Sequence, residues 1–172
     1  MKKEFQRIWL WPLTLISTII VADQVSKYLI LQNLGTVPGT STPLLGDWLK
    51  FTLIHNTGIA FGLFQNNAQF FTVTSTLITI GTLYFYRYHL PYQLPLVQIC
   101  IGMIVGGAIG NIIDRMQYGY VIDFVHVTWF PGIFNVADSC ITVGVIVLAI
   151  FLLIIGDGPT TQTTPVDNAS QG

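Results

Sequence analysis

The sequence predicts an all-α integral membrane protein with four transmembrane helices and a small extracytoplasmic β element at the membrane interface. Three observations support this fold class. Of 172 residues, 52% are hydrophobic and only 9% are charged, whereas charged residues make up about a quarter of a typical soluble protein. Four apolar stretches can each cross about 30 Å of hydrocarbon as a helix. One further segment alternates apolar and polar residues as a half-buried strand does.

The four predicted spans cover approximately residues 8–31, 70–88, 94–113 and 136–155, and residues 1–156 form one predicted polytopic domain. The chain starts with MKKEFQR before its first apolar run, which is also typical of a secretory signal peptide. That run exceeds the about 7–15 residues of a signal-peptide core, and no clean small-x-small cleavage site follows it. We therefore expect an uncleaved first helix.

The positive residues of the connections predict the orientation. Lys2, Lys3 and Arg7 precede the first span and Arg87 lies between the second and third. The positive-inside rule then places both termini in the cytoplasm and the two longer connections outside. Residues 157–172, rich in Thr, Pro and Asp, are predicted to form a disordered cytoplasmic tail.

The first outer connection contains GDWLKFTLIHNTG, residues 46–58, in which Leu49, Phe51 and Leu53 alternate with polar residues. We expect a strand at the interface, because an open strand edge is not tolerated in lipid. Turns are expected before it, at Pro38, Gly39, Pro43 and Gly46. The second outer connection, residues 117–134, mixes β-branched and aromatic residues and is expected to pair with or pack against that strand.

Small residues predict how the third span packs. Gly102, Gly106 and Gly110 recur on one helical face, which lets another helix approach closely. A phosphate-binding loop is the alternative, but no Lys-Ser/Thr pair follows and the glycines lie in mid-span. Cys100 and Cys140 lie in apolar runs at opposite sides of the membrane, so no disulfide is expected between them.

Polar residues gather at the outer ends of the predicted spans. Ionisable groups at such depth are functional candidates, because a charge at the centre of a membrane helix costs about 2.5–3.5 kcal/mol. The residues concerned are Asp23, Gln24, Ser26, Lys27, Asn56, Asn111, Asp114, Arg115, Asn135 and Asp138.

Structural interpretations compete for several of these residues. Asp23 and Lys27 are four apart and can pair on one helix face. Asp114 beside Arg115 can be an ordinary interfacial ion pair. Two further residues, Asn135 and Asp138, can cap the fourth helix. None of these interpretations explains Asp123, which lies at no predicted helix start.

Two carboxylates brought close together share one proton and can hold a water between them, as in aspartic proteases. Asp123 and Asp138 are the candidates, and this chemistry requires no metal. One alternative is a divalent cation held by Asp23, Asp114, Asp123 and Asp138. Another is a small proton- or ion-coupled transporter that uses the same carboxylates. The net charge of −1 argues against a nucleic-acid partner.

Five segments resemble the bacterial lipoprotein signal peptidase family, also called signal peptidase II. They are DQVSK at 23–27, NTGIAFG at 56–62, GGAIGNIIDR at 106–115, VIDF at 121–124 and FNVADS at 134–139. They follow one another in the family's order, across all four predicted spans. Ile59 departs from the pattern, because the family commonly has alanine there.

The resemblance implies an intramembrane aspartic endopeptidase of the bacterial cytoplasmic (inner) membrane, with its active site at the extracytoplasmic face. Its substrate would be a prolipoprotein, cleaved before the diacylglyceryl-modified cysteine, and no cofactor or metal is implied. Asp123 and Asp138 would be catalytic, and Asp114 a structural partner. The substrate-binding or supporting residues would be Asp23, Lys27, Asn56, Asn111, Arg115 and Asn135. Nothing in the sequence requires more than a monomer.

Overall fold

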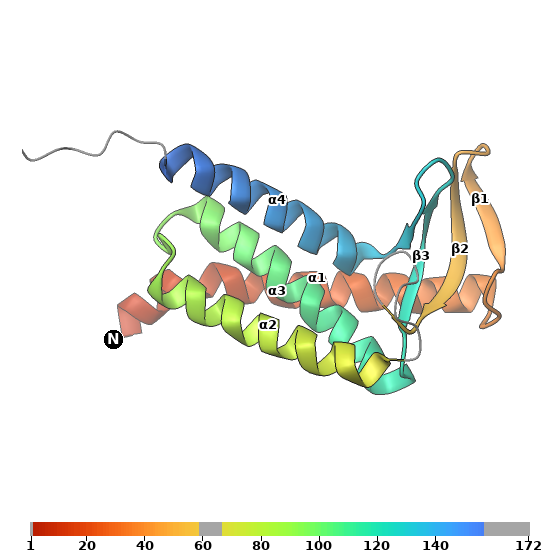
Figure 1. Cartoon of the computed structure of the whole chain (residues 1–172), viewed down its shortest axis with the longest axis horizontal. Coiled ribbons are helices and arrows are strands. Elements are labelled where there is room, and N and C mark those ends of the chain that lie inside the picture. The colour runs from red at the N-terminus through yellow and green to blue at the C-terminus, as the bar shows by residue number, and fades with distance from the viewer. Residues whose placement is uncertain (1, 59–66, 157–172) are drawn as a thin grey trace, which may run out of the picture.

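The computed structural model of the chain describes residues 2–58 and 67–156 (Figure 1). Their helices are α1 (Lys2–Leu34), α2 (Ala68–Tyr88), α3 (Pro95–Tyr118) and α4 (Val136–Gly156). Their strands are β1 (Ser41–Leu45), β2 (Leu49–Asn56), β3 (Val121–Val127) and β4 (Ile133–Phe134). The predicted tail, residues 157–172, and Ile59 with the rest of its motif up to Gly62 lie outside the described residues.

The helices form a bundle in which α3 contacts each of the other three, and the sheet stands at one end of the bundle (Figure 1). Glycines allow this close packing. A Cβ at Gly102 would lie 2.9 Å from the Leu15 side chain, and one at Gly106 would lie 3.0 Å from Ile19 Cβ. The predicted packing role of the glycine face is therefore confirmed for the contact of α3 with α1.

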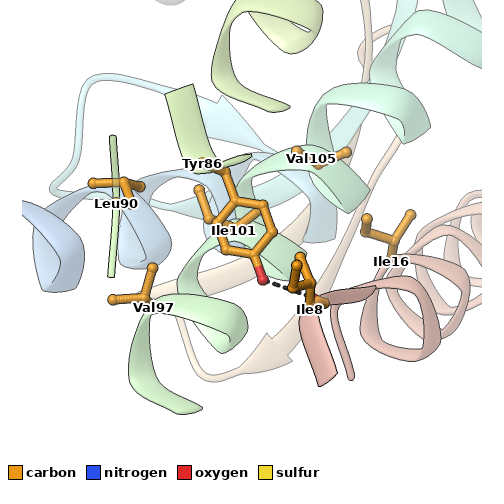
Figure 2. Close-up of a cluster of buried hydrophobic side chains, with 7 residues drawn as sticks. All are labelled: Ile8, Ile16, Tyr86, Leu90, Val97, Ile101 and Val105. Carbon is orange, nitrogen blue, oxygen red and sulfur yellow. Dashed lines mark hydrogen bonds between the residues drawn. The ribbon is translucent and has the colours of Figure 1, made fainter. Parts of the chain in front are cut away.

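A buried apolar cluster joins α1, α2 and α3, and Figure 2 shows its side chains. Its centre is Tyr86, whose hydroxyl donates a hydrogen bond of 2.6 Å to the carbonyl of Ile8. Within a helix that carbonyl would accept from residue 12, but Pro12 has no N–H. Tyr86 thus satisfies a carbonyl that the proline leaves free.

Among the described residues, three helices are long and apolar enough to cross a membrane: Ile8–Leu34, Pro95–Tyr118 and Val136–Ile154. α2 covers the second predicted span and has a suitable length, but threonine and serine make it less apolar. Three of the four predicted spans therefore meet this criterion among the described residues, and α2 does not.

The four described strands form one antiparallel sheet in the order β1-β2-β3-β4. β2 pairs with β3, which confirms the strand predicted within residues 46–58 and its predicted pairing with residues 117–134. Gly39 and Gly46 have positive φ angles of 91° and 55° and form turns as expected. The expectation of a turn at Pro43 is wrong, because Pro43 lies in β1 and pairs with Lys50 of β2. β1 is an edge strand, where proline does not interrupt the ladder.

A second apolar cluster attaches the sheet to the C-terminal part of α1. It comprises Ile30, Leu53, Ile122 and Phe124. Since successive side chains of a strand point to opposite faces, Asp123 faces away from this cluster. The sheet packing thereby directs the carboxylate of β3 toward α3 and α4. Cys100 and Cys140 are free, in agreement with the prediction.

Candidate active site

Asp123 on β3 and Asp138 in the first turn of α4 are both held by Asn135. The Asn135 side-chain amide donates a hydrogen bond of 2.7 Å to Asp123 Oδ1. Its side-chain oxygen accepts the backbone N–H of Asp138 at 2.8 Å, and its backbone N–H donates to Asp138 Oδ2 at 3.3 Å. One residue therefore contacts both carboxyl-bearing elements.

The start of α4 explains this geometry. The bonds between Asn135 and Asp138 are reciprocal, as in a capping box, where the residue before the helix and the third helical residue satisfy each other's N–H groups. A negative charge is also favoured at a helix N-terminus. The capping interpretation is thus confirmed for Asn135, whose amide group nevertheless remains directed at Asp123.

The other oxygen of each carboxylate accepts an amide from a different element. Asn111 on α3 donates to Asp138 Oδ1 at 2.7 Å, and Asn56 on β2 donates to Asp123 Oδ2 at 2.9 Å. The structure therefore brings these two aspartates and the three predicted asparagines into one hydrogen-bonded group. Its members come from β2, α3, β3 and the start of α4.

The electrostatic environment of Asp123 favours its neutral form. This side chain is 2% exposed. Burial, and then the nearby charge of Asp138, raise the pKa of Asp123 to about 7, although the amides of Asn56 and Asn135 oppose the shift. Asp123 can therefore carry a proton near neutral pH.

A buried ion cluster contacts this group through Lys27 and Asn111. It consists of Asp23, Lys27 and Asp114, which are 0%, 2% and 0% exposed. The Lys27 ammonium lies 2.7 Å from Asp23 Oδ2 and 2.8 Å from Asp114 Oδ2. The predicted Asp23–Lys27 pairing is confirmed. The expectation that Asp114 pairs with Arg115 is wrong among the described residues, because adjacent helical residues point in different directions.

Gln24 is a site residue to which the sequence alone assigned no role. Its amide donates to Asp114 Oδ1 at 2.8 Å, and also lies 3.3 Å from both Asp23 Oδ2 and the Gly110 carbonyl. Its position within the first motif, three residues before Lys27 on the same helix, was the available signal.

Arg115 lies on α3 near the two aspartates, whose charges act on it. Its Nη2 donates a long hydrogen bond of 3.4 Å to the Gly58 carbonyl, while the backbone N–H of Gly58 donates to Asn56 Oδ1 at 3.1 Å. The Arg115 Nε is buried and has no hydrogen-bond partner among the described residues.

The cation hypothesis gains no support from this geometry. Across residues 2–58 and 67–156, no three His, Cys, Asp or Glu side chains lie together as a metal site would require. Asp23 and Asp114 instead face the ammonium of Lys27.

Comparison with known proteins identifies the family. A family model described as signal peptidase (SPase) II matches residues 15–154. The chain belongs to the signal peptidase II family. This match contains every residue of the candidate site, from Asp23 to Asp138, and confirms the resemblance inferred from the five motifs.

Several relatives in the signal peptidase II family carry the name lipoprotein signal peptidase. The protein of Moorella thermoacetica is 42% identical over 83% of this chain and 93% of its own length. That of Caulobacter vibrioides is 44% identical over 75% of this chain and 78% of its own. A bacterial membrane enzyme solved at 2.3 Å superposes with a TM-score of 0.79 at 31% identity, covering 89% of this chain and 93% of that one.

Proposed function

We propose that the chain is an aspartic endopeptidase that removes the signal peptide from bacterial prolipoproteins, with Asp123 and Asp138 as its catalytic dyad. The peptide bond hydrolysed is the one before the diacylglyceryl-modified cysteine. The observation that carries this proposal is the bridge from Asn135 to both carboxyl-bearing elements. The family membership and the relatives named lipoprotein signal peptidase support the reaction class.

Different roles for the two carboxylates follow from their surroundings. Asp138 accepts hydrogen bonds from the Asn111 amide and the Asn135 backbone at a helix N-terminus, and these donors stabilise an anion. Asp123 is deeply buried, with a pKa of about 7. Asp138 is accordingly the resting base and Asp123 the resting acid.

The chemistry proceeds in two steps. Asp138 takes a proton from a water whose oxygen attacks the scissile carbonyl carbon, while Asp123 donates its proton to the developing oxyanion. The C–N bond then breaks, the proton held by Asp138 passes to the departing amine, and Asp123 regains its own. The products are a signal peptide with a new carboxyl terminus and a lipidated cysteine with a free amino group.

The amides and the guanidinium around the dyad position the reacting groups. Asn56, Asn111 and Asn135 fix the two carboxylates through the bonds described above. The guanidinium of the half-buried Arg115 binds a carbonyl of the substrate backbone, which lacks another partner once it leaves water. Asp23 and Lys27 support this site as a buried ion pair, and Asp114 is their structural partner through its own ion pair with Lys27.

We propose that all four helices cross the membrane, α2 together with α1, α3 and α4. Each threonine of α2 donates its hydroxyl to the carbonyl four residues earlier, so these groups need no water. Residues 1–156 then form one polytopic peptidase domain in the bacterial cytoplasmic membrane. Both termini are cytoplasmic, the sheet and dyad lie at the extracytoplasmic face, and the enzyme acts as a monomer.

Substrate selection follows from the lipid. A diacylglyceryl group contributes about 0.8 kcal/mol of membrane affinity per buried methylene, so it holds the adjacent peptide bond at the bilayer surface. β3 and the start of α4, which carry the dyad, lie at the sheet end of the bundle (Figure 1), where such a bond would arrive. The transporter alternative instead expects carboxylates near the middle of the helices.

The direct test is incubation of the purified chain with a prolipoprotein carrying the diacylglyceryl group, beside the same precursor without lipid. We expect release of the signal peptide from the lipidated precursor only, with the modified cysteine as the new N-terminus. Failure to cleave the lipidated precursor, or cleavage at another bond, would contradict the proposal.

A further inference from the structure

The two acids of the buried ion cluster each bind a backbone N–H beside one member of the dyad. Asp23 Oδ1 accepts the N–H of Ala137 at 3.0 Å, and Ala137 precedes Asp138. Asp114 Oδ2 accepts the N–H of Ile122 at 3.0 Å, and Ile122 precedes Asp123. Each acid thus attaches one carboxyl-bearing element to α1 or α3.

Lys27 joins the two attachments, since its ammonium contacts Asp23 at 2.7 Å and Asp114 at 2.8 Å. We propose that Asp23, Lys27 and Asp114 form a positioning clamp that sets the separation of the two catalytic carboxylates. This inference rests on the proposed dyad. The clamp residues do not touch the reacting atoms, and act through the backbone of β3 and α4.

Lys27 has a second effect through Asn111. Its ammonium donates to Asn111 Oδ1 at 3.2 Å, and the Asn135 amide donates to the same oxygen at 3.1 Å. Both partners are donors, so only the oxygen of the Asn111 amide can face them. The Asn111 nitrogen is therefore directed to Asp138, where it donates at 2.7 Å.

The cost of the cluster supports a positioning role. Desolvating three charges is expensive, and a well-packed apolar core of similar volume is often as stable as a buried ion network. The neighbouring helix is shaped to fit the cluster, because a Cβ at Gly110 would lie 2.6 Å from Asp23 Oδ2. A buried cluster that binds the backbone of both dyad-bearing elements, β3 and α4, therefore serves geometry more than stability.

The experiment uses Asp23→Asn and Asp114→Asn in the full-length enzyme, with the exposed Asp47→Asn as the matched control. Asparagine keeps an oxygen for the backbone N–H but removes the charge that Lys27 binds. We expect kcat per folded enzyme to fall about 10- to 100-fold, because displacement of about 1 Å costs up to about 10²-fold. KM should change less than about threefold, and Asp47→Asn should match the wild type.

The pH profile separates positioning from a general loss of stability. Two nearby carboxylates push their apparent pKa values apart, so moving them apart narrows the bell-shaped profile of kcat. Charges that act on the dyad come from Asp23, Lys27 and Arg115, and Asp114 is paired with Lys27. From β2 the dyad faces the neutral amide of Asn56. Removing one such charge shifts both apparent pKa values of the kcat profile in the same direction. Moving the carboxylates apart instead brings the two apparent pKa values closer together, and this smaller difference is the expected result.

Two further sets of variants keep the outcome decisive. If the asparagine variants do not fold, Asp114→Glu keeps the charge but displaces the carboxylate, and the same narrowing is expected. A folded clamp variant with unchanged kcat would overturn the clamp. So would a folded variant with lower kcat but an unchanged difference between the two apparent pKa values. Asp123→Asn and Asp138→Asn are assayed in parallel. Activity in either variant would contradict the proposed dyad. If both are inactive while the clamp variants are fully active, only the clamp is contradicted.

Discussion

The side-chain amide of Asn135 lies 2.7 Å from Asp123 Oδ1, while the same side chain caps the helix that carries the second carboxylate. These two functions of Asn135 are separable. Asn135→Ser keeps a hydroxyl that can cap the helix, but it lacks the amide that binds Asp123. Asn135→Ala loses both.

We therefore expect Asn135→Ala to lose about 0.5–2 kcal/mol of stability with the cap, and Asn135→Ser to lose little. Both should lose about 10²-fold in kcat, because Asp123 keeps only the Asn56 amide and is no longer fixed at its other oxygen. Thermal unfolding and cleavage of a lipidated precursor measure the two effects. A serine variant with full activity would show that the contact with Asp123 is dispensable.

The raised pKa of Asp123 predicts the pH dependence of activity. If Asp123 must be protonated, kcat/KM should fall as pH rises through about 7, the pKa of its carboxyl in the free enzyme. The measurement is the cleavage rate between about pH 5 and 9 with lipidated precursor well below saturation. A rate that stays constant up to pH 9 would contradict the role of Asp123 as the acid.

The same group predicts a pH-dependent cost in stability. Its pKa rises from 3.8 to about 7 on folding, so the folded protein binds a proton that the unfolded chain releases. Stability from this group is therefore present at low pH and is lost as pH rises from about 4 to about 7. Asp123→Asn removes that loss of stability. The difference in unfolding temperature between Asp123→Asn and the wild type should therefore be more in favour of the variant at pH 8 than at pH 5. An equal difference at the two pH values would exclude the effect.

The bond from Tyr86 to the Ile8 carbonyl predicts coupling to Pro12. Tyr86→Phe leaves that buried carbonyl without a partner and should cost about 1–2 kcal/mol of stability, with little change in kcat. Pro12→Ala restores a helical N–H to the carbonyl. In that background the cost of Tyr86→Phe should shrink, as thermal unfolding of the four proteins in the cycle would reveal. Additive effects would refute the coupling.

Several elements of the fold could be predicted because each depends on local pattern. Apolar runs of helical length predicted α1, α3 and α4, and alternation predicted β2. β1 was missed because proline was interpreted as a turn, although an edge strand accepts Pro43. α2 shows the limit of run length, since its threonines make membrane insertion a matter of composition as well as length.

The site could be predicted in its members but not in its connections. Spacing correctly paired Asp23 with Lys27, because residues four apart share a helix face. It could not pair Asp114 with Lys27, or Asn135 with Asp123, because those contacts depend on helix packing and strand register. Residue type and position suggested which groups were unusual, while tertiary structure determined which of them meet.

The central claim is that Asp123 and Asp138 are the two catalytic carboxylates, and the most direct measurement is single-turnover cleavage of a lipidated prolipoprotein by purified Asp123→Asn and Asp138→Asn. Each substitution preserves the shape of the side chain while removing its carboxylate chemistry. We expect no detectable cleavage by either protein, although both fold and insert as the wild type does. Cleavage at a near wild-type rate by either folded variant would contradict the account.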